Sequence, residues 1–255
     1  MIVDNSCSNP IRKSLIKLNN KNIKVIFNNK NYGIGYSANK FVKTLRKENC
    51  FEWALMLDQD SIINFDLRKL AKKITKSQFK ILGLNYSEKK IINKDNEQPK
   101  YVTVNRIIQS GTFIRKSVYM NYLHDESYFL DFTDFDYCAR IMQHNIQIHK
   151  IENYYLQHFV GETEINKFLT FERKRSNHPP INCFFMSRNR IVMYKKHLYK
   201  SSLKKILFRQ IKEMFLTLLF EDNSFKKNEA RIKGFFAGMT NRRFTCIDEV
   251  KRFLN

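Results

Sequence analysis

The sequence predicts an α/β fold with a mixed, mainly parallel sheet and a basic helical extension at its C-terminal end. Up to about residue 85, short apolar runs alternate with segments whose apolar residues recur at helical spacing. This alternation is typical of strands joined by crossover helices. From about Asn182 onward the chain becomes helical and basic. We therefore place an α/β domain at residues 1–180 and the extension at residues 181–255.

The predicted elements follow one another from the first residue. Short apolar runs indicate strands at residues 1–3, 23–27, 53–57 and 81–85. Helical periodicity indicates helices at residues 11–18, 37–46 and 67–74, the second capped by Ser37. Asn and Gly favour turns, so residues 28–35 form a loop. Apolar runs at residues 107–114 and 146–151 flank an acidic stretch at residues 125–136.

The extension contains a long amphipathic helix, predicted over residues 203–220. Residues 195–255 hold 15 Lys and Arg against 6 Asp and Glu, a net charge of +9. The apolar stripe consists of Leu203, Ile206, Leu207, Ile211, Met214, Phe215, Leu218 and Leu219, and the basic face of Lys204, Lys205, Arg209 and Lys212. Such a helix can lie on an anionic membrane surface. Alternatively, the stripe packs on the α/β domain and the charges are solvated.

The net charge and the cysteines of the sequence limit which kinds of binding partner and metal site are expected. A formal net charge of +22 implies anionic partners, which are nucleic acid, an acidic membrane face or phosphorylated substrates. The five cysteines show no C-x-x-C spacing, which argues against a zinc knuckle or a disulfide framework. A reducing cytosol fits this cysteine usage best. Apolar runs of 18 residues, which could span a membrane, are absent from the sequence.

Asp58 and Asp60 follow the apolar run 54–57, so they leave the end of a predicted buried strand. Two carboxylates two residues apart repel each other unless a cation lies between or beside them. Mg²⁺ or Mn²⁺ accepts such ligands, and phosphate oxygens can complete its shell. Asp4 also follows an apolar run, and ligands of α/β sheets lie beyond the carboxyl ends of strands. The pattern predicts a metal and nucleotide-diphosphate site, although a surface turn explains most isolated Asp-x-Asp pairs.

A second group of acids, Asp131, Asp134 and Asp136, lies among aromatic residues. Aromatic neighbours exclude water and can raise the pKa of a carboxylate, which suits a general base. The same acids suit a helix N-terminus, where the helix dipole favours Asp. Both interpretations can hold together, with Asp134 chemical and Asp136 structural. His158 is a further candidate, but a histidine considered alone is more often a structural residue than a metal ligand.

Together these segments resemble family 2 glycosyltransferases, and within them the rhamnosyltransferase-like members of O-antigen and capsule gene clusters. The similar segments occur in the family's order and cover nearly the whole chain. They are residues 3–6, 31–39, 58–61, 109–112, 131–136, 158–162, 187–190 and 232–238. Each motif is weak alone, whereas eight in order are specific.

The resemblance implies a GT-A-like fold and inverting sugar transfer by one direct displacement. It makes Asp134 the base that takes the proton from the acceptor hydroxyl. It implies Mg²⁺ or Mn²⁺ to stabilise the leaving nucleoside diphosphate. The implied metal ligands are Asp58, Asp60 and His158, with Asp58 nearer the ribose. The residues implied in nucleotide binding are Asp4, Asn31, Gly33, Asn39, Asp58 and Arg188, where a structural salt bridge is an equal alternative for Arg188. The residues implied at the sugar or acceptor are Gly111, Thr112 and Asp131.

The resemblance also implies the partners. The expected donor is dTDP-rhamnose, although another donor, such as a galactofuranose or hexose nucleotide, fits the same residues. The expected acceptor is a lipid-linked saccharide. The expected location is the cytoplasm, peripherally on the inner face of the cell membrane.

Two alternatives compete with this interpretation. The family usually begins with an additional strand and helix, and these are apparently missing before Val3, which predicts a weakly active or inactive enzyme. The net charge alone favours a basic nucleic-acid-binding protein. However, the sequence has no zinc spacing or RNA-binding aromatic motif, and its acidic clusters disfavour a nucleic-acid groove.

Overall fold

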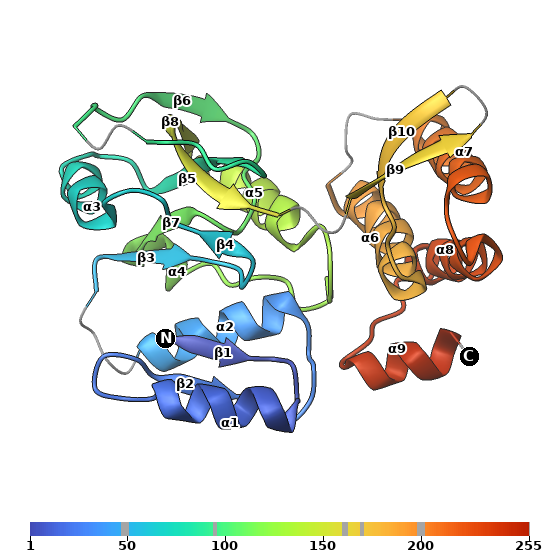
Figure 1. Cartoon of the computed structure of the whole chain (residues 1–255), viewed down its shortest axis with the longest axis horizontal. Coiled ribbons are helices and arrows are strands. Elements are labelled where there is room, and N and C mark those ends of the chain that lie inside the picture. The colour runs from blue at the N-terminus through green and yellow to red at the C-terminus, as the bar shows by residue number, and fades with distance from the viewer. Residues whose placement is uncertain (47–50, 94–95, 160–162, 169–170, 198–201, 255) are drawn as a thin grey trace. The chain divides into compact units, whose positions relative to one another are not determined.

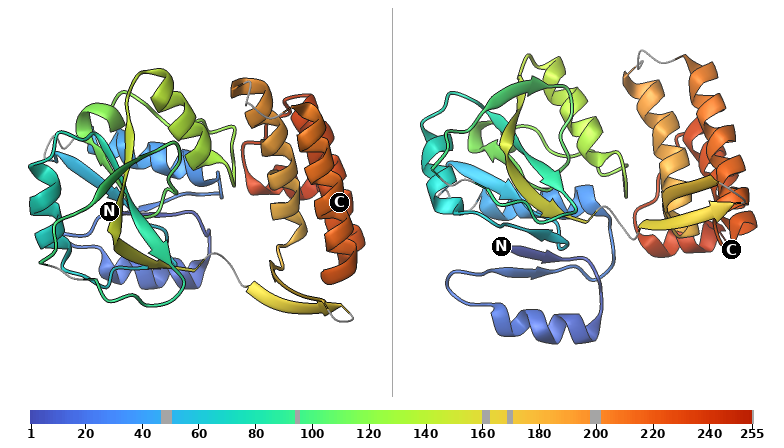
Figure 2. Two further views of the ribbon diagram at one scale, coloured as in Figure 1. Left: turned by 90° about the horizontal axis from the view of Figure 1, so that it is seen from above. Right: turned by 45° about the horizontal axis from the view of Figure 1, so that its top comes forward.

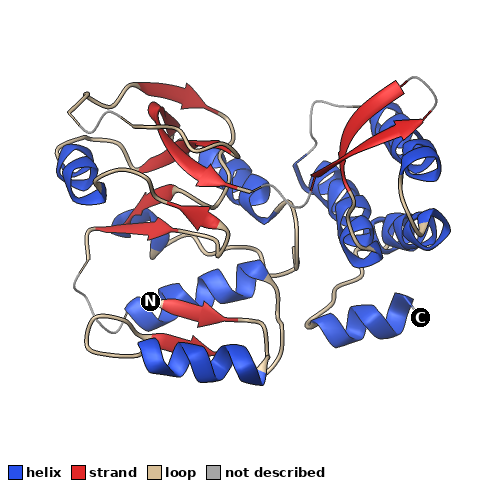
Figure 3. Ribbon diagram, viewed as in Figure 1, coloured by secondary structure: helices blue, strands red, loops and turns tan. Residues whose placement is uncertain are grey.

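The structure, a computed structural model, describes residues 1–46, 51–93, 96–159, 163–168, 171–197 and 202–254 (Figure 1). The chain divides into two compact units. The first comprises Met1–Leu45, His124–Thr133 and Thr163–Asn255, and the second Arg46–Leu123 and Asp134–Glu162. Strands and helices mix in both units (Figure 3). The predicted α/β class with C-terminal helices is therefore confirmed.

The second unit contains a six-stranded sheet in the order β3-β7-β5-β8-β4, with β6 paired to β8. Its strands are β3 (Trp53–Met56), β4 (Ser61–Ile62), β5 (Ile81–Ser87), β6 (Tyr101–Val104), β7 (Thr112–Arg115) and β8 (Ile148–His158). Its helices are α3 (Leu67–Thr75), α4 (Lys116–Tyr119) and α5 (Thr133–Gln143), of which α5 begins one residue before the unit boundary.

This sheet is mixed, as predicted, but it holds more antiparallel pairing than the sequence suggested. Only β5 and β8 pair in parallel in this sheet as described, whereas the pairs β3–β7, β5–β7, β4–β8 and β6–β8 are antiparallel. Parallel neighbours need a long crossover connection, while antiparallel strands can be joined by short loops. The strand–helix alternation up to about residue 85 predicted a mainly parallel sheet, and it missed the short strands β4 and β6.

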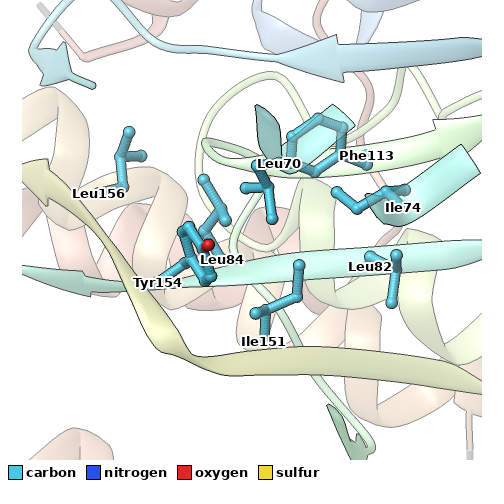
Figure 4. Packing of buried hydrophobic residues seen from close by; sticks show 8 residues of the cluster. All are labelled: Leu70, Ile74, Leu82, Leu84, Phe113, Ile151, Tyr154 and Leu156. Atoms are coloured by element: carbon cyan, nitrogen blue, oxygen red, sulfur yellow. The ribbon is translucent and has the colours of Figure 1, made fainter. Parts of the chain in front are cut away.

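The core of the second unit is an apolar cluster between α3 and the sheet (Figure 4). Its buried members are Leu70, Ile74, Leu82, Leu84, Phe113, Ile151, Tyr154 and Leu156. Asp66 fixes the start of α3, because its carboxylate accepts hydrogen bonds from the backbone N–H groups of Arg68 and Lys69 at 3.0 and 3.1 Å. The core thus anchors the strands whose ends carry the acidic residues.

The first unit begins with a parallel pair of strands, β1 (Ile2–Asp4) and β2 (Val25–Phe27), joined through α1 (Asn9–Leu18). After β2 the chain enters α2 (Ile34–Leu45), which begins earlier than the predicted Ser37. The cause is Gly33, whose backbone adopts φ +86° and turns the chain directly into the helix. The Ile34 N–H then donates to the Phe129 carbonyl at 2.9 Å.

Gly33 offers a test of this turn. A Cβ atom at Gly33 would lie 2.4 Å from the Phe129 carbonyl oxygen, in a backbone conformation that L residues rarely adopt. We expect Gly33→Ala to lower the free energy of unfolding by about 2–4 kcal/mol. Gly35→Ala is the matched control, because Gly35 lies inside α2 with its nearest contact at 3.2 Å. Urea unfolding of both variants measures the difference, and equal costs would contradict this explanation of the turn.

The rest of the first unit is mainly helical. It comprises α6 (Pro180–His197), α7 (Leu203–Phe220), α8 (Ser224–Met239), α9 (Ile247–Leu254) and an unpredicted hairpin of β9 (Thr163–Phe168) and β10 (Phe171–Ser176). Helices α6 and α8 pack closely, because Gly234 and Gly238 bring α8 against the backbone of Phe184 and Arg188. Figure 2 shows α6, α7 and α8 side by side.

The two faces of α7 differ from the prediction. Ile206 and Leu216 are buried, but most of the predicted apolar stripe, including Leu207, Ile211 and Phe215, is exposed. Packing against the rest of the unit therefore covers only part of the apolar surface of this helix. Among the described residues, the helices are too short or too polar to cross a membrane.

Candidate functional site

The three predicted metal ligands lie together in the second unit. Ligand atoms of Asp58, Asp60 and His158 all lie within 4.8 Å of one another. Asp58 and Asp60 follow β3, and His158 is the last residue of β8. Antiparallel pairing places His158 directly opposite Ser61 of β4. The sheet therefore brings together residues that lie about a hundred positions apart.

The electrostatics of this cluster suit a cation. Burial raises the pKa of Asp58, and the charge of Asp60 raises it further, while His158 lowers it. The His158 Nδ1 atom lies 3.3 Å from Asp60 Oδ1. A buried carboxylate whose pKa is raised by a neighbouring carboxylate favours a positive ion beside it. Two carboxylates and one imidazole are a donor set that Mn²⁺ accepts, and the carboxylates alone suit Mg²⁺. The residues present therefore fit a divalent cation.

Two serines, Ser61 and Ser110, form hydrogen bonds to this cluster. Both lie inside the sequence motifs, but nothing in the sequence alone assigned them a function. Ser61 Oγ lies 2.8 Å from His158 Nδ1 and 2.6 Å from Ser110 Oγ. The Asp58 N–H donates to Ser110 Oγ at 3.1 Å. These contacts link the Asp58 backbone to the His158 side chain through one chain of hydrogen bonds. In the sequence, each serine is adjacent to a predicted site residue, Ser61 to Asp60 and Ser110 to Gly111. The contact of Ser61 with His158, however, depends on the pairing of β4 with β8.

Asp134 lies in the same unit, in the first turn of α5. Its Oδ1 accepts a hydrogen bond from the Phe135 N–H at 2.8 Å. Burial raises the pKa of Asp134 to about 6, with the charge of Asp58 adding to the rise and a backbone N–H of Gln109 opposing it. Asp134 is therefore electrostatically coupled to the acidic cluster. A carboxylate with a pKa near 6 can accept a proton at neutral pH.

This pKa makes a prediction about pH. If Asp134 acts as a base, the reaction needs its ionised form, so kcat/KM should fall about tenfold per pH unit below about 6 and level off above it. The measurement is a pH–rate profile that extends roughly 1.5 pH units below and 2 units above that pKa. A profile flat down to pH 5 would contradict the role of Asp134.

Asp136 is structural, as the sequence allowed. Its side chain is fully buried and pairs with Arg140 Nε at 2.8 Å, one helical turn later in α5. Arg140 in turn donates to the Leu123 carbonyl at 2.8 Å. Asp136 therefore holds α5 to the preceding loop rather than facing a ligand.

Thr112 is the first residue of β7, and Gly111 directly precedes it, beside the acidic cluster. Gly111 adopts φ +80°, and its N–H donates to the Met56 carbonyl at 2.8 Å, at the end of β3. Thr112 is buried, and its hydroxyl donates to the Ile108 carbonyl at 2.6 Å. Gln109, in contrast, has a buried Oε1 that accepts no hydrogen bond from the part of the chain that the structure describes. Gln109, rather than Thr112, therefore offers a free polar atom near Asp134.

The predicted nucleotide residues Asp4 and Asn31 lie in the first unit. Asp4 is buried at the end of β1, where Oδ1 accepts hydrogen bonds from Ser6 and Oδ2 lies 3.7 Å from Arg12 Nε. This Oδ2 accepts no hydrogen bond from any described residue. Asn31 Oδ1 accepts from Asn5 Nδ2 at 2.8 Å. Asn5, which the sequence left without a role, thus joins β1 to the Asn/Gly loop.

Asn39 and Arg188 are buried, and their side chains form hydrogen bonds within the first unit. Asn39 is buried and exchanges two hydrogen bonds with the His124 backbone, at 2.8 and 2.9 Å. Arg188 is 1% exposed and donates to the carbonyls of Ser127 and Arg242. Hence the expectation that these two side chains contact the nucleotide is not supported by their surroundings. A single sequence could not separate these roles, because both residues stand inside motifs that also carry exposed positions.

Asp131 lies in the first unit, two residues before the boundary with the second. Asp131 and Phe132 both adopt positive φ angles, 59° and 61°. Asn189 of α6 donates to the Asp131 carbonyl at 3.1 Å, which helps to hold this unusual backbone. Consecutive left-handed residues without glycine cost energy and are concentrated at functional sites. The last residues of the histidine motif, Gly161 and Glu162, lie outside the described residues.

Comparison with known proteins adds one family. The family model described as "Glycosyl transferase family 2" matches residues 1–144. A search of curated proteins gives no match. Among solved structures, one similar to this chain is "Crystal Structure of A197 from STIV", with 16% sequence identity and a TM-score of 0.40, covering 69% of this chain and 93% of that chain.

Proposed function

Because this chain belongs to glycosyl transferase family 2, we propose that it is an inverting glycosyltransferase that moves a sugar from a nucleotide-sugar donor to a saccharide acceptor. The observation that carries the proposal is the pairing of two features in one unit. These are the cluster of Asp58, Asp60 and His158, and the raised pKa of Asp134 beside it.

The proposed reaction is one direct displacement at the anomeric carbon. Asp134 takes the proton from the acceptor hydroxyl as that oxygen attacks, and the bond from the sugar to the nucleoside diphosphate breaks. Mg²⁺ or Mn²⁺, when held by Asp58, Asp60 and His158, would neutralise the charge that develops on the leaving diphosphate. Ser61 and Ser110 keep His158 and Asp58 oriented.

The remaining proposed contacts are with the nucleoside and the sugar. Asp4 has a buried carboxylate oxygen without a hydrogen bond from any described residue, which supports its contact with the nucleoside, together with Asn31 and the turn at Gly33. Gly111, at the turn before β7, stays a proposed contact of the sugar, and Gln109 supplies a free acceptor for a sugar hydroxyl. Asp131 stays a proposed contact of the sugar or acceptor. Arg188 and Asn39 are left out because their donors are engaged in the core.

We further propose dTDP-rhamnose as donor and a lipid-linked saccharide as acceptor, on the inner face of the cell membrane. The high positive charge of +22 supports an anionic donor and an anionic membrane face. The experiment is a screen of nucleotide sugars for hydrolysis that depends on Mn²⁺. Turnover of one donor in the presence of Mn²⁺, but not in its absence, is the expected result. Hydrolysis of none, with no donor binding, would overturn the proposal.

A nucleic-acid-binding protein is the second candidate, because the same charge favours it. The acidic cluster of Asp58 and Asp60 argues against it. Binding to a random oligonucleotide, measured as a function of salt, separates the two. Tight, salt-dependent binding without donor hydrolysis would favour this second candidate.

A further inference from the structure

Helix α7 exposes a row of large apolar side chains. Phe208, Ile211, Phe215 and Leu218 are 69%, 66%, 58% and 48% exposed. Their spacing of three or four residues places them on one face of the helix. The opposite face, with Ile206, Gln210 and Thr217, is buried. A single exposed apolar residue needs no explanation, but a continuous row of four marks an interaction surface.

A second exposed row lies on the neighbouring helix α8. Phe225, Ile232, Phe236 and Met239 are 83%, 46%, 62% and 44% exposed. The two helices meet where Asn228 Nδ2 donates to the Met214 carbonyl at 3.0 Å. Residues three or four positions from this contact include Ile211 and Leu218 on α7, and Phe225 and Ile232 on α8. The two rows therefore border the same helix–helix contact, and we call them together the α7–α8 face.

Basic side chains border the row on α7. Lys204 and Lys212 lie four residues before and after Phe208, so both stand beside the apolar row. The 18 residues of α7 include Lys204, Lys205, Arg209 and Lys212, against Glu213 as the single acid. Long basic side chains can bury their methylene stems against an apolar surface while their charges reach anionic head groups. Apolar and cationic groups thus point the same way.

We infer that the α7–α8 face binds an anionic lipid surface, with its phenylalanines inserted among the acyl chains. This inference rests on the proposed function, because binding to the membrane would hold the enzyme next to a lipid-linked acceptor. A second copy of this chain is a poorer occupant, because it would bring lysines against lysines. Shallow insertion in the plane of the membrane suits a basic amphipathic helix of this kind.

The test is co-sedimentation with vesicles of phosphatidylcholine, with and without phosphatidylglycerol. We expect binding to the anionic vesicles only. The double substitution Phe208→Gln and Phe215→Gln should weaken it by about tenfold or more. Lys204→Gln and Lys212→Gln should each weaken it by about fivefold. Ile92→Gln is the matched control, because Ile92 is 86% exposed in the other unit, and it should change nothing.

A second readout locates the contact. Trp53 is the chain's one tryptophan and lies in the second unit. Phe208→Trp should keep vesicle binding and add a second tryptophan, on the α7–α8 face. Brominated lipid should then quench the fluorescence of this added tryptophan, whereas it should leave the Trp53 fluorescence of the wild-type protein unchanged. Circular dichroism of each variant confirms that it folds.

Four results would overturn the inference. These are equal binding to neutral vesicles, unchanged binding of the Phe208/Phe215 variant, dimer formation without vesicle binding, and oligonucleotide binding without vesicle binding. Donor hydrolysis without vesicles distinguishes this inference from the proposed function. If the protein hydrolyses donor but does not bind vesicles, only the inference about the α7–α8 face is contradicted. If it binds vesicles but hydrolyses no donor, only the proposed function is contradicted.

Discussion

Asp134→Asn is expected to lower the rate of sugar transfer by roughly three orders of magnitude while leaving donor affinity within about threefold. The asparagine keeps the size of the side chain and its hydrogen bond from the Phe135 N–H, but it cannot take a proton. Single-turnover transfer rates give the first quantity, and calorimetric titration with the donor gives the second. Retained turnover with normal donor binding would contradict the role of Asp134.

The same variant should not lose stability at neutral pH. The pKa of Asp134 is raised in the folded protein from 3.8 to about 6. Folding therefore favours the protonated form, and the stability that this provides is present below about pH 4 and is lost as the pH rises through about 6. At pH 7 the ionised carboxylate opposes folding, so the neutral asparagine should raise the free energy of unfolding by about 1–2 kcal/mol. Urea unfolding at pH 7 tests this.

Asp136→Asn is the matched control in the same helix turn. Asp136 is fully buried and paired with Arg140, so this substitution should destabilise the fold by about 3 kcal/mol. Any loss of transfer should then follow the loss of folded protein. If Asp136→Asn abolished transfer while the protein remained folded and Asp134→Asn did not, the assignments of the two acids would be reversed.

Asp60→Ala is expected to weaken both Mn²⁺ and donor binding by about a hundredfold. Asp60 contributes one of three clustered ligand groups, and its side chain is 42% exposed, so its removal should cost little folding energy. The variant also removes the carboxylate oxygen that lies 3.3 Å from His158 Nδ1. Calorimetric titration with Mn²⁺, and with donor at saturating Mn²⁺, measures both effects.

The control for Asp60→Ala is Asp66→Ala. Asp66 is an acid of the same unit that caps α3 instead of facing the cluster. Its substitution should cost about 1 kcal/mol of stability and leave Mn²⁺ affinity unchanged. Unchanged Mn²⁺ and donor affinity in the Asp60 variant would contradict the assignment of Asp60 as a metal ligand. Transfer that continues at full rate in excess EDTA would contradict a metal-dependent reaction.

The sequence by itself determined the features that depend on neighbouring residues. The apolar run before Asp58 predicted a strand, and β3 ends at Met56, two residues before Asp58. The apolar spacing of residues 203–220 predicted a helix with the bounds of α7. The acids Asp134 and Asp136 suited a helix N-terminus, which favours acids, and both lie in the first turn of α5. The catalytic role of Asp134 stays a prediction. Asp136 forms an ion pair with Arg140, four residues later in the same helix.

The tertiary structure alone decided which distant residues meet and which surfaces stay exposed. The contact of Ser61 with His158 depends on β4–β8 pairing, and a register shift of one residue would turn either side chain to the other face. Only packing decided that Arg188 is buried with its guanidinium bonded to backbone carbonyls. Periodicity showed that α7 has two faces, but only packing decided that Phe215 remains exposed while Leu216 is buried. Local spacing fixes the direction of a side chain relative to its own helix, whereas its neighbours are set by the whole chain.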